Sequence, residues 1–185
     1  DPNEQTLLNV PLGDPVPSDG LLYYLEWSSP SDINQGRGRR LNLVCFDPGS
    51  RDTAWRSPIA VAGSESDLTA SLERSQPAFA IYGNRVTIAH GAAYSSSNCG
   101  IVARSDIRDG RTDWVYHYTP IPPAERSVRN HGSPPLLAGD RVICMPRDAR
   151  RIFALDQRTG RLLWENTLVL GVQLVGVVED LLIVR

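Results

Sequence analysis

Short runs of alternating or β-branched hydrophobic residues, separated by turn-forming residues, recur along the whole chain. A first group of runs predicts a weak strand near Val16 and strands at 21–27, 40–46 and 53–59. The middle group predicts strands at 77–82, 85–91, 100–105 and 112–118. The clearest group predicts strands at 134–138, 141–146, 151–155 and 161–168. The pattern therefore indicates units of four antiparallel strands and argues against a helical bundle.

Tight-turn dipeptides precede one strand in each unit. Asp19–Gly20, Gly83–Asn84 and Gly139–Asp140 each lead into a hydrophobic run, and Glu179–Asp180 does the same near the end. Glycine, asparagine and aspartate tolerate the positive φ of two-residue hairpin turns. The last dipeptide therefore predicts that a further unit begins there.

An internal repeat organises the chain. In three places an aspartate is followed eight residues later by a tryptophan: Asp47 with Trp55, Asp106 with Trp114, and Asp156 with Trp164. Gly110 and Gly160 hold the fifth position of two copies, whereas Arg51 holds it in the first. We expect structural roles. The aspartate accepts backbone N–H bonds after the third strand, the glycine supplies a left-handed residue, and the tryptophan packs one unit on the next.

These residues resemble the repeat of quinoprotein-type (PQQ-like) β-propellers, whose tryptophan-docking motif is Ala-x-Asp-x-x-Thr-Gly-x-x-x-Trp. The last copy matches the motif completely, with Ala154, Asp156, Thr159, Gly160 and Trp164. The middle copy departs from it at Arg104 and Asp109, where alanine and threonine are expected. The first copy keeps only its aspartate and tryptophan. The resemblance covers nearly the whole chain.

The resemblance implies an all-β fold made of four-stranded antiparallel propeller blades. Residues 1–185 then form one partial domain, with blades at about 14–59, 76–118 and 134–168 and the start of the next at 172–185. Members of this family usually close rings of seven or eight blades. Three blades and a beginning cannot close, and both ends look cut, so we expect a fragment of a longer protein or a partial ring with exposed strand edges.

Strand alternation predicts which end of the blades carries the long connections. Those connections lie at 28–39, 60–76, 92–99 and 119–133, and all four fall at the same end. Long loops on a rigid scaffold are where binding surfaces usually form. The candidate binding residues there are Arg37, Arg39, Arg40, Arg126, Arg129 and His131. They either engage a carboxylate or phosphate group or are solvated charges paired with Asp and Glu.

The amino-acid composition excludes several kinds of ligand and reaction. The chain has 19 basic residues, all arginine, against 21 acidic ones, and its net charge of −2 argues against a nucleic-acid binder. The absence of lysine excludes a Schiff base or a P-loop lysine. The most apolar stretch, 168–178, is shorter than the roughly 20 residues of a membrane-spanning helix, so no transmembrane segment is expected.

Cysteines and histidines do not fall at metal-ligand spacing. Cys45 and Cys144 lie within apolar runs and read as small buried residues, whereas Cys99 lies in a polar loop. His90, His117 and His131 are far apart in sequence and read as structural or surface residues. No nucleophile elbow or phosphate-binding glycine loop occurs either. The sequence therefore predicts no catalytic residue and no metal site.

Two functions remain open. The first is a non-catalytic platform that binds protein partners and needs no cofactor, as in the periplasmic lipoprotein of this family that assists outer-membrane barrel assembly. The second is part of a dehydrogenase that uses PQQ with calcium. By resemblance, such enzymes add a calcium site of Glu, Asn and Asp, a catalytic Asp and often two adjacent cysteines. No adjacent cysteines occur in this sequence. Asp32, Glu125 and Asn130 are possible ligands, but no spacing selects them. The platform is favoured, and the resemblance alone favours a bacterial cell-envelope or periplasmic location.

Overall fold

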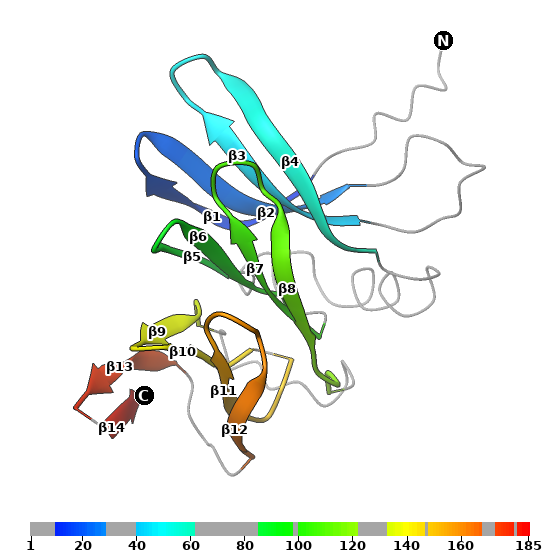
Figure 1. Ribbon diagram of the computed structural model, residues 1–185. Coiled ribbons are helices and arrows are strands. Elements are labelled where there is room, and N and C mark those ends of the chain that lie inside the picture. Colours follow the sequence, from blue (N-terminus) through cyan, green and yellow to red (C-terminus); the bar gives the residue numbers. More distant parts are fainter. Residues whose placement is uncertain are drawn as a thin grey trace.

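The computed structural model describes residues 10–28, 40–61, 85–97, 100–121, 133–146, 148–167, 173–179 and 181–185. All regular elements in these ranges are β-strands, and each sheet is an up-and-down antiparallel sheet in chain order (Figure 1). Blade 1 contains β1 (Val10–Ser18), β2 (Leu21–Ser28), β3 (Arg40–Asp47) and β4 (Asp52–Val61). Blade 2 contains β5 (Arg85–Ala89), β6 (Ala92–Ser96), β7 (Ile101–Asp106) and β8 (Thr112–His117).

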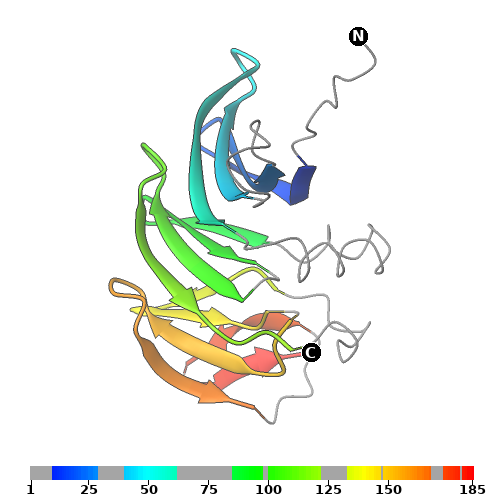
Figure 2. The ribbon, with the colours of Figure 1, turned by 90° about the vertical axis from the view of Figure 1, so that its right-hand side faces the viewer.

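Blade 3 and a final hairpin complete the described chain. Blade 3 contains β9 (Leu136–Ala138), β10 (Arg141–Cys144), β11 (Ile152–Asp156) and β12 (Leu162–Asn166). The hairpin pairs β13 (Leu174–Val178) with β14 (Leu181–Val184). The sheets are stacked one behind the next in a fan, as Figure 2 shows, and they do not close into a ring. The predicted fold class, an incomplete set of propeller blades, is confirmed.

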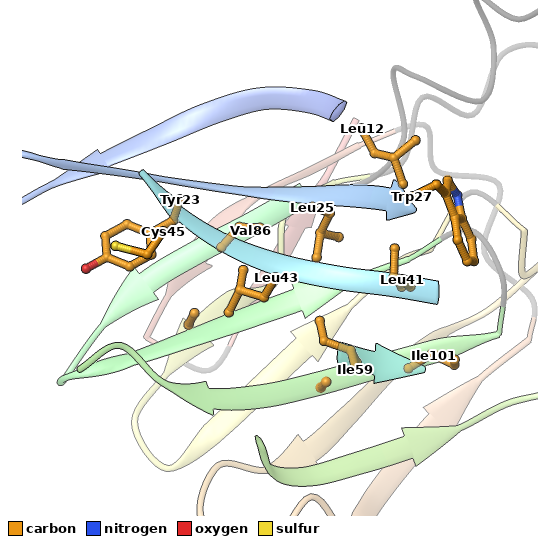
Figure 3. Close-up of a cluster of buried hydrophobic side chains, with 12 residues drawn as sticks. Leu12, Tyr23, Leu25, Trp27, Leu41, Leu43, Cys45, Ile59, Val86 and Ile101 are labelled. Atoms are coloured by element: carbon orange, nitrogen blue, oxygen red, sulfur yellow. The ribbon is translucent and has the colours of Figure 1, made fainter. Parts of the chain in front are cut away.

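The hydrophobic cores lie between the blades. Alternate residues of β2 and β3 point toward blade 2, so Tyr23, Leu25, Leu43 and Cys45 lie in one cluster with Val86 and Ile101 of blade 2 (Figure 3). A second cluster joins blades 2 and 3, and a third joins blade 3 to the β13–β14 hairpin. Neighbouring blades thus pack face to face, as adjacent blades of a propeller do.

The first two strands of blade 2 differ from the prediction. The predicted strand at 77–82 and the predicted turn at Gly83–Asn84 lie outside the described residues. The predicted strand at 85–91 is in fact β5 followed by a hairpin turn at His90–Gly91. His90, predicted to lie on a strand, adopts a φ of 52° in that turn. The predicted long loop at 92–99 was wrong, because its first five residues form β6.

Small side chains explain this error. Ala92 and Ala93 have weak strand propensity, so the sequence of β6 does not read as a strand. In the structure both residues are fully or almost fully buried between two packed sheets, where a small side chain allows close approach. Tertiary packing therefore overrides local propensity.

Cys45 and Cys144 are free thiols with essentially no solvent exposure, which confirms that they are small core residues. Burial raises the pKa of both thiols. Cys99 lies outside the described residues.

Candidate functional site

The tryptophans of blades 1 and 2 are seated on the turn between the third and fourth strands of the next blade. The Nε1–H of Trp55 donates to the carbonyl of Ile107 at 3.2 Å, and that of Trp114 donates to the carbonyl of Gln157 at 3.1 Å. A Cβ on Gly110 would stand 2.6 Å from Cε3 of Trp55. Only glycine allows the indole to lie this close to the backbone of the turn.

The motif glycines also have the backbone conformation that the turn requires. Gly110 and Gly160 have φ values of 74° and 70°. Arg51, at the same position of blade 1, keeps a φ of 59° despite its side chain. A non-glycine residue seldom adopts this left-handed region, so blade 1 retains the turn geometry at an energetic cost.

The motif aspartates close these turns. Asp47 accepts the N–H of Gly49 at 2.8 Å, Asp106 accepts that of Arg108 at 2.9 Å, and Asp156 accepts that of Thr159 at 2.7 Å. Further bonds come from the Arg108 guanidinium to Asp106 and from the Thr159 hydroxyl to Asp156.

These bonds stabilise the ionised carboxylates and lower the pKa of each aspartate. The side-chain bond from Arg108 is the main cause for Asp106, the Gly49 N–H for Asp47, and the Thr159 hydroxyl for Asp156. All three are structural carboxylates of the blade turns.

The motif tryptophan of blade 3, Trp164, is more exposed than those of blades 1 and 2. Trp164 pairs with Ala154 across β11 and β12, as the motif requires, but its side chain is 36% exposed. Leu162 and Leu163 beside it are also exposed. The β13–β14 hairpin covers Ile143 and Ala154, but among the described residues no turn of a further blade lies on Trp164. In the part of the chain that the structure describes, the outer half of this blade face is therefore exposed around Trp164.

The end of the blades opposite the motif turns, here called the loop end, is where the longer connections leave the strands; the end with the motif turns is the short-turn end. Residues 29–39 join β2 to β3, residues 62–84 join β4 to β5, and residues 122–132 lie between β8 and β9. Arg40, the first residue of β3, is exposed at this end. The other candidate binding residues lie outside the described residues: Arg37, Arg39, Arg126, Arg129 and His131. The same holds for Asp32, Glu125 and Asn130.

A buried carboxylate that the sequence does not single out ties three connections together at this end. Asp148, with no solvent exposure, accepts the backbone N–H of Gly100 at 2.9 Å. Its other oxygen lies 2.6 Å from the hydroxyl of Tyr118, which also lies 2.7 Å from the carbonyl of Ser97. The backbone carbonyl of Asp148 accepts the N–H of Ile121 at 2.7 Å. The chain leaving β8 is therefore held against the loops that precede β7 and β11.

Arg151 adds a second link in the same region. Its guanidinium donates to the carbonyl of Thr119 at 3.3 Å and pairs with Glu165 of β12 at 3.0 Å. Together with Asp148, this contact gives the segment at 118–121 a defined position at the base of the connection that carries Arg126 and Arg129. The described part of the loop end is thus preorganised, which lowers the entropic cost of binding there.

Among the described residues, no three His, Cys, Asp or Glu side chains lie close enough together to hold a metal ion. No helix in the same residues is long and apolar enough to cross a membrane.

Comparison with known proteins identifies the family. A family model described as outer membrane protein assembly factor BamB matches residues 15–173, which is most of the chain. The chain belongs to this family. The BamB protein of Alkalilimnicola ehrlichii is 23% identical over 143 residues, which cover 77% of this chain and 31% of that protein.

Solved structures agree on the fold. BamB from Moraxella catarrhalis superposes with a TM-score of 0.53 at 21% identity, covering 88% of this chain and 39% of that one. A europium-containing methanol dehydrogenase gives 0.52 at 13% identity, covering 85% and 26%. Both have PQQ-type blades, and at these identities the likeness concerns the fold alone. The chain therefore spans well under half the length of these relatives.

Proposed function

We propose that this chain is part of a non-catalytic BamB-type propeller that binds protein partners at the end of the blades where the long connections lie. Membership of the BamB family carries this proposal. The partners would be components of the assembly of outer membrane proteins, since the family description names that process. The protein would then act in the bacterial cell envelope, on the periplasmic side of the outer membrane.

The geometry supports a platform at that end. The seated tryptophans, glycines and aspartates of the motif are engaged in packing one blade on the next. At the opposite end, Asp148 and Arg151 hold three connections in place. Long connections on a rigid base are a common arrangement for a binding surface. In this proposal no cofactor takes part.

Site-specific photo-crosslinking of the full-length protein in the cell envelope tests the proposal. A photoreactive amino acid at Arg40 or Thr119 labels the loop end, and one at Arg158 or Asp140 labels the short-turn end as a matched control. We expect crosslinks to components of outer-membrane protein assembly from the first pair and none from the second. Crosslinks from the short-turn end alone, or none from the loop end, would contradict the proposal.

A further inference from the structure

The motif turn of blade 2 is held from two sides. The carbonyl of Ile107 accepts the indole N–H of Trp55 at 3.2 Å, and the backbone N–H of Ile107 donates to the carbonyl of Gly91 at 3.2 Å. Gly91 belongs to the turn between β5 and β6 of the same blade. The residue after the turn aspartate therefore joins the tryptophan of the preceding blade to a second turn of its own blade.

Blade 3 repeats this arrangement with a different side chain. The carbonyl of Gln157 accepts the indole N–H of Trp114 at 3.1 Å, and its backbone N–H donates to the carbonyl of Asp140 at 2.7 Å. Asp140 lies in the turn between β9 and β10. Isoleucine in blade 2 and glutamine in blade 3 make the same two backbone bonds. The arrangement therefore requires a backbone N–H at this position, whatever the side chain.

The corresponding residue of blade 1 is Pro48, which directly follows the turn aspartate Asp47. Proline has no backbone N–H. It therefore cannot make the bond that ties the motif turn to the turn between the first two strands of the blade. The bonds to the Asp47 carboxylate come from the N–H of Gly49 and the hydroxyl of Ser50, both within the motif turn itself.

Arg51 is a second departure in the same turn. Its φ of 59° is close to the 74° and 70° of Gly110 and Gly160, so its Cβ projects where a Cβ on either glycine would project. In both of those turns that point is 2.6 Å from an atom of the seated indole. An indole seated on blade 1 in the same way would therefore collide with the Cβ of Arg51.

We propose that the motif turn of blade 1 receives no tryptophan in the full-length protein and stays open to solvent, so that the series of indole contacts begins at blade 2. Pro48 and Arg51 act independently, because one removes a donor and the other adds a Cβ. Each seated indole supplies buried area and a hydrogen bond to the contact between two blades. The face of blade 1 turned away from blade 2 lacks this contribution and is the more easily opened side of the blade.

Cysteine labelling of the full-length protein with a maleimide tests this proposal. Pro48→Cys, Ile107→Cys and Gln157→Cys place a thiol at the same position of three motif turns, in a background whose accessible native cysteines are replaced by serine. The side chains at 107 and 157 pack against the preceding blade. We therefore expect the thiol at 48 to react about tenfold faster, or more, than those at 107 and 157. Arg158→Cys, at an exposed position of the blade 3 turn, gives the rate of an uncovered thiol.

Slow labelling of Pro48→Cys, at the rate of Ile107→Cys, would overturn the proposal. Arg51→Cys is a second probe that keeps the proline, and it should react at the rate of Arg158→Cys. If any variant at 48, 107 or 157 fails to fold, as judged by circular dichroism, the comparison of Arg51→Cys with Arg158→Cys decides. Protection at position 51 would then contradict the proposal.

A stability measurement gives an independent readout. Arg51→Gly relieves a left-handed residue of its Cβ and, under this proposal, removes no contact with a preceding blade. The folding equilibrium constant of the full-length protein, measured by urea unfolding, should therefore rise or stay unchanged. A decrease would mean that the Arg51 side chain is packed against another part of the ring, which contradicts the proposal.

Discussion

Gly160 lies against the indole of Trp114 so closely that a Cβ on Gly160 would stand 2.6 Å from Cδ2 of the tryptophan. The two residues belong to different blades and lie 46 positions apart in the sequence, so no local sequence pattern connects them. The contact, together with the bond from the indole N–H to Gln157, fixes the register of blade 3 on blade 2.

Replacing this glycine should be costly. Gly160→Ala combines a left-handed backbone at φ 70° with a clash against Trp114, so we expect a loss of about 2–5 kcal/mol in the free energy of unfolding. Gly139→Ala is the matched control, because its φ is also positive but nothing lies within 4 Å of the added Cβ. The free energy of unfolding of this control should fall only by the cost of a left-handed backbone conformation, about 1–2 kcal/mol. Equal losses in urea unfolding would show that the indole contact is not tight.

The three tryptophans should not be equivalent in this chain. Trp114→Ala removes a side chain that is 9% exposed and hydrogen-bonded, and should cost about 3–5 kcal/mol. Trp164→Ala removes one that is 36% exposed and should cost clearly less. Urea unfolding of the two variants measures the difference. If Trp164→Ala were as destabilising as Trp114→Ala, the exposed position of Trp164 would be contradicted.

Acid should weaken the blade turns. The pKa of Asp106 is lowered in the folded chain, mainly by its bond from Arg108. Its stabilising effect is therefore complete above the pKa of the unfolded chain, near pH 4, and is lost as the pH falls toward the lower folded value. Asp106→Asn keeps an acceptor for the turn but removes the charge, so its stability should fall less steeply below about pH 4. An identical slope in Asp106→Asn and the native chain, measured by urea unfolding between about pH 2 and pH 7, would refute the assignment.

Removal of the buried carboxylate should loosen the loop end. Asp148→Ala leaves the Gly100 N–H and the Tyr118 hydroxyl without this acceptor, and should cost about 2–4 kcal/mol. Tyr118→Phe removes one of these bonds and should cost about 1 kcal/mol. Hydrogen exchange should increase at Gly100, Tyr118 and Ile121 in the Asp148 variant, while the β3–β4 turn of blade 1 serves as an internal reference. Uniform loss of protection would mean that Asp148 has no local role.

The strands with strong alternation and the docking motif could be predicted from sequence, because both are short-range patterns. Asp156, Gly160 and Trp164 fall within nine residues, and their spacing reflects the turn and strand they occupy. The first two strands of blade 2 could not, because Ala92 and Ala93 are small and only packing between sheets places them in a strand.

The Asp148 network could not be predicted either, for a different reason. Gly100 and Asp148 are 48 residues apart, and Tyr118 is 30 residues from Asp148. No periodicity connects them, since their contact depends on how two blades are stacked. The role of Gln157 was hidden in the same way, whereas Arg104 was visible as a departure from the motif. The strand order agrees with the predicted alternation, because β2, β4 and β8 all finish at the same end of the blades.

The most direct test of a non-catalytic role is a titration of the full-length protein with pyrroloquinoline quinone and Ca²⁺. Binding is followed by the absorbance of the quinone, and turnover by the reduction of an electron-acceptor dye with an alcohol as substrate. We expect no binding at tens of micromolar quinone, a range in which a resident cofactor would saturate its site. Saturable binding with alcohol-dependent dye reduction would contradict it and make this chain part of a dehydrogenase.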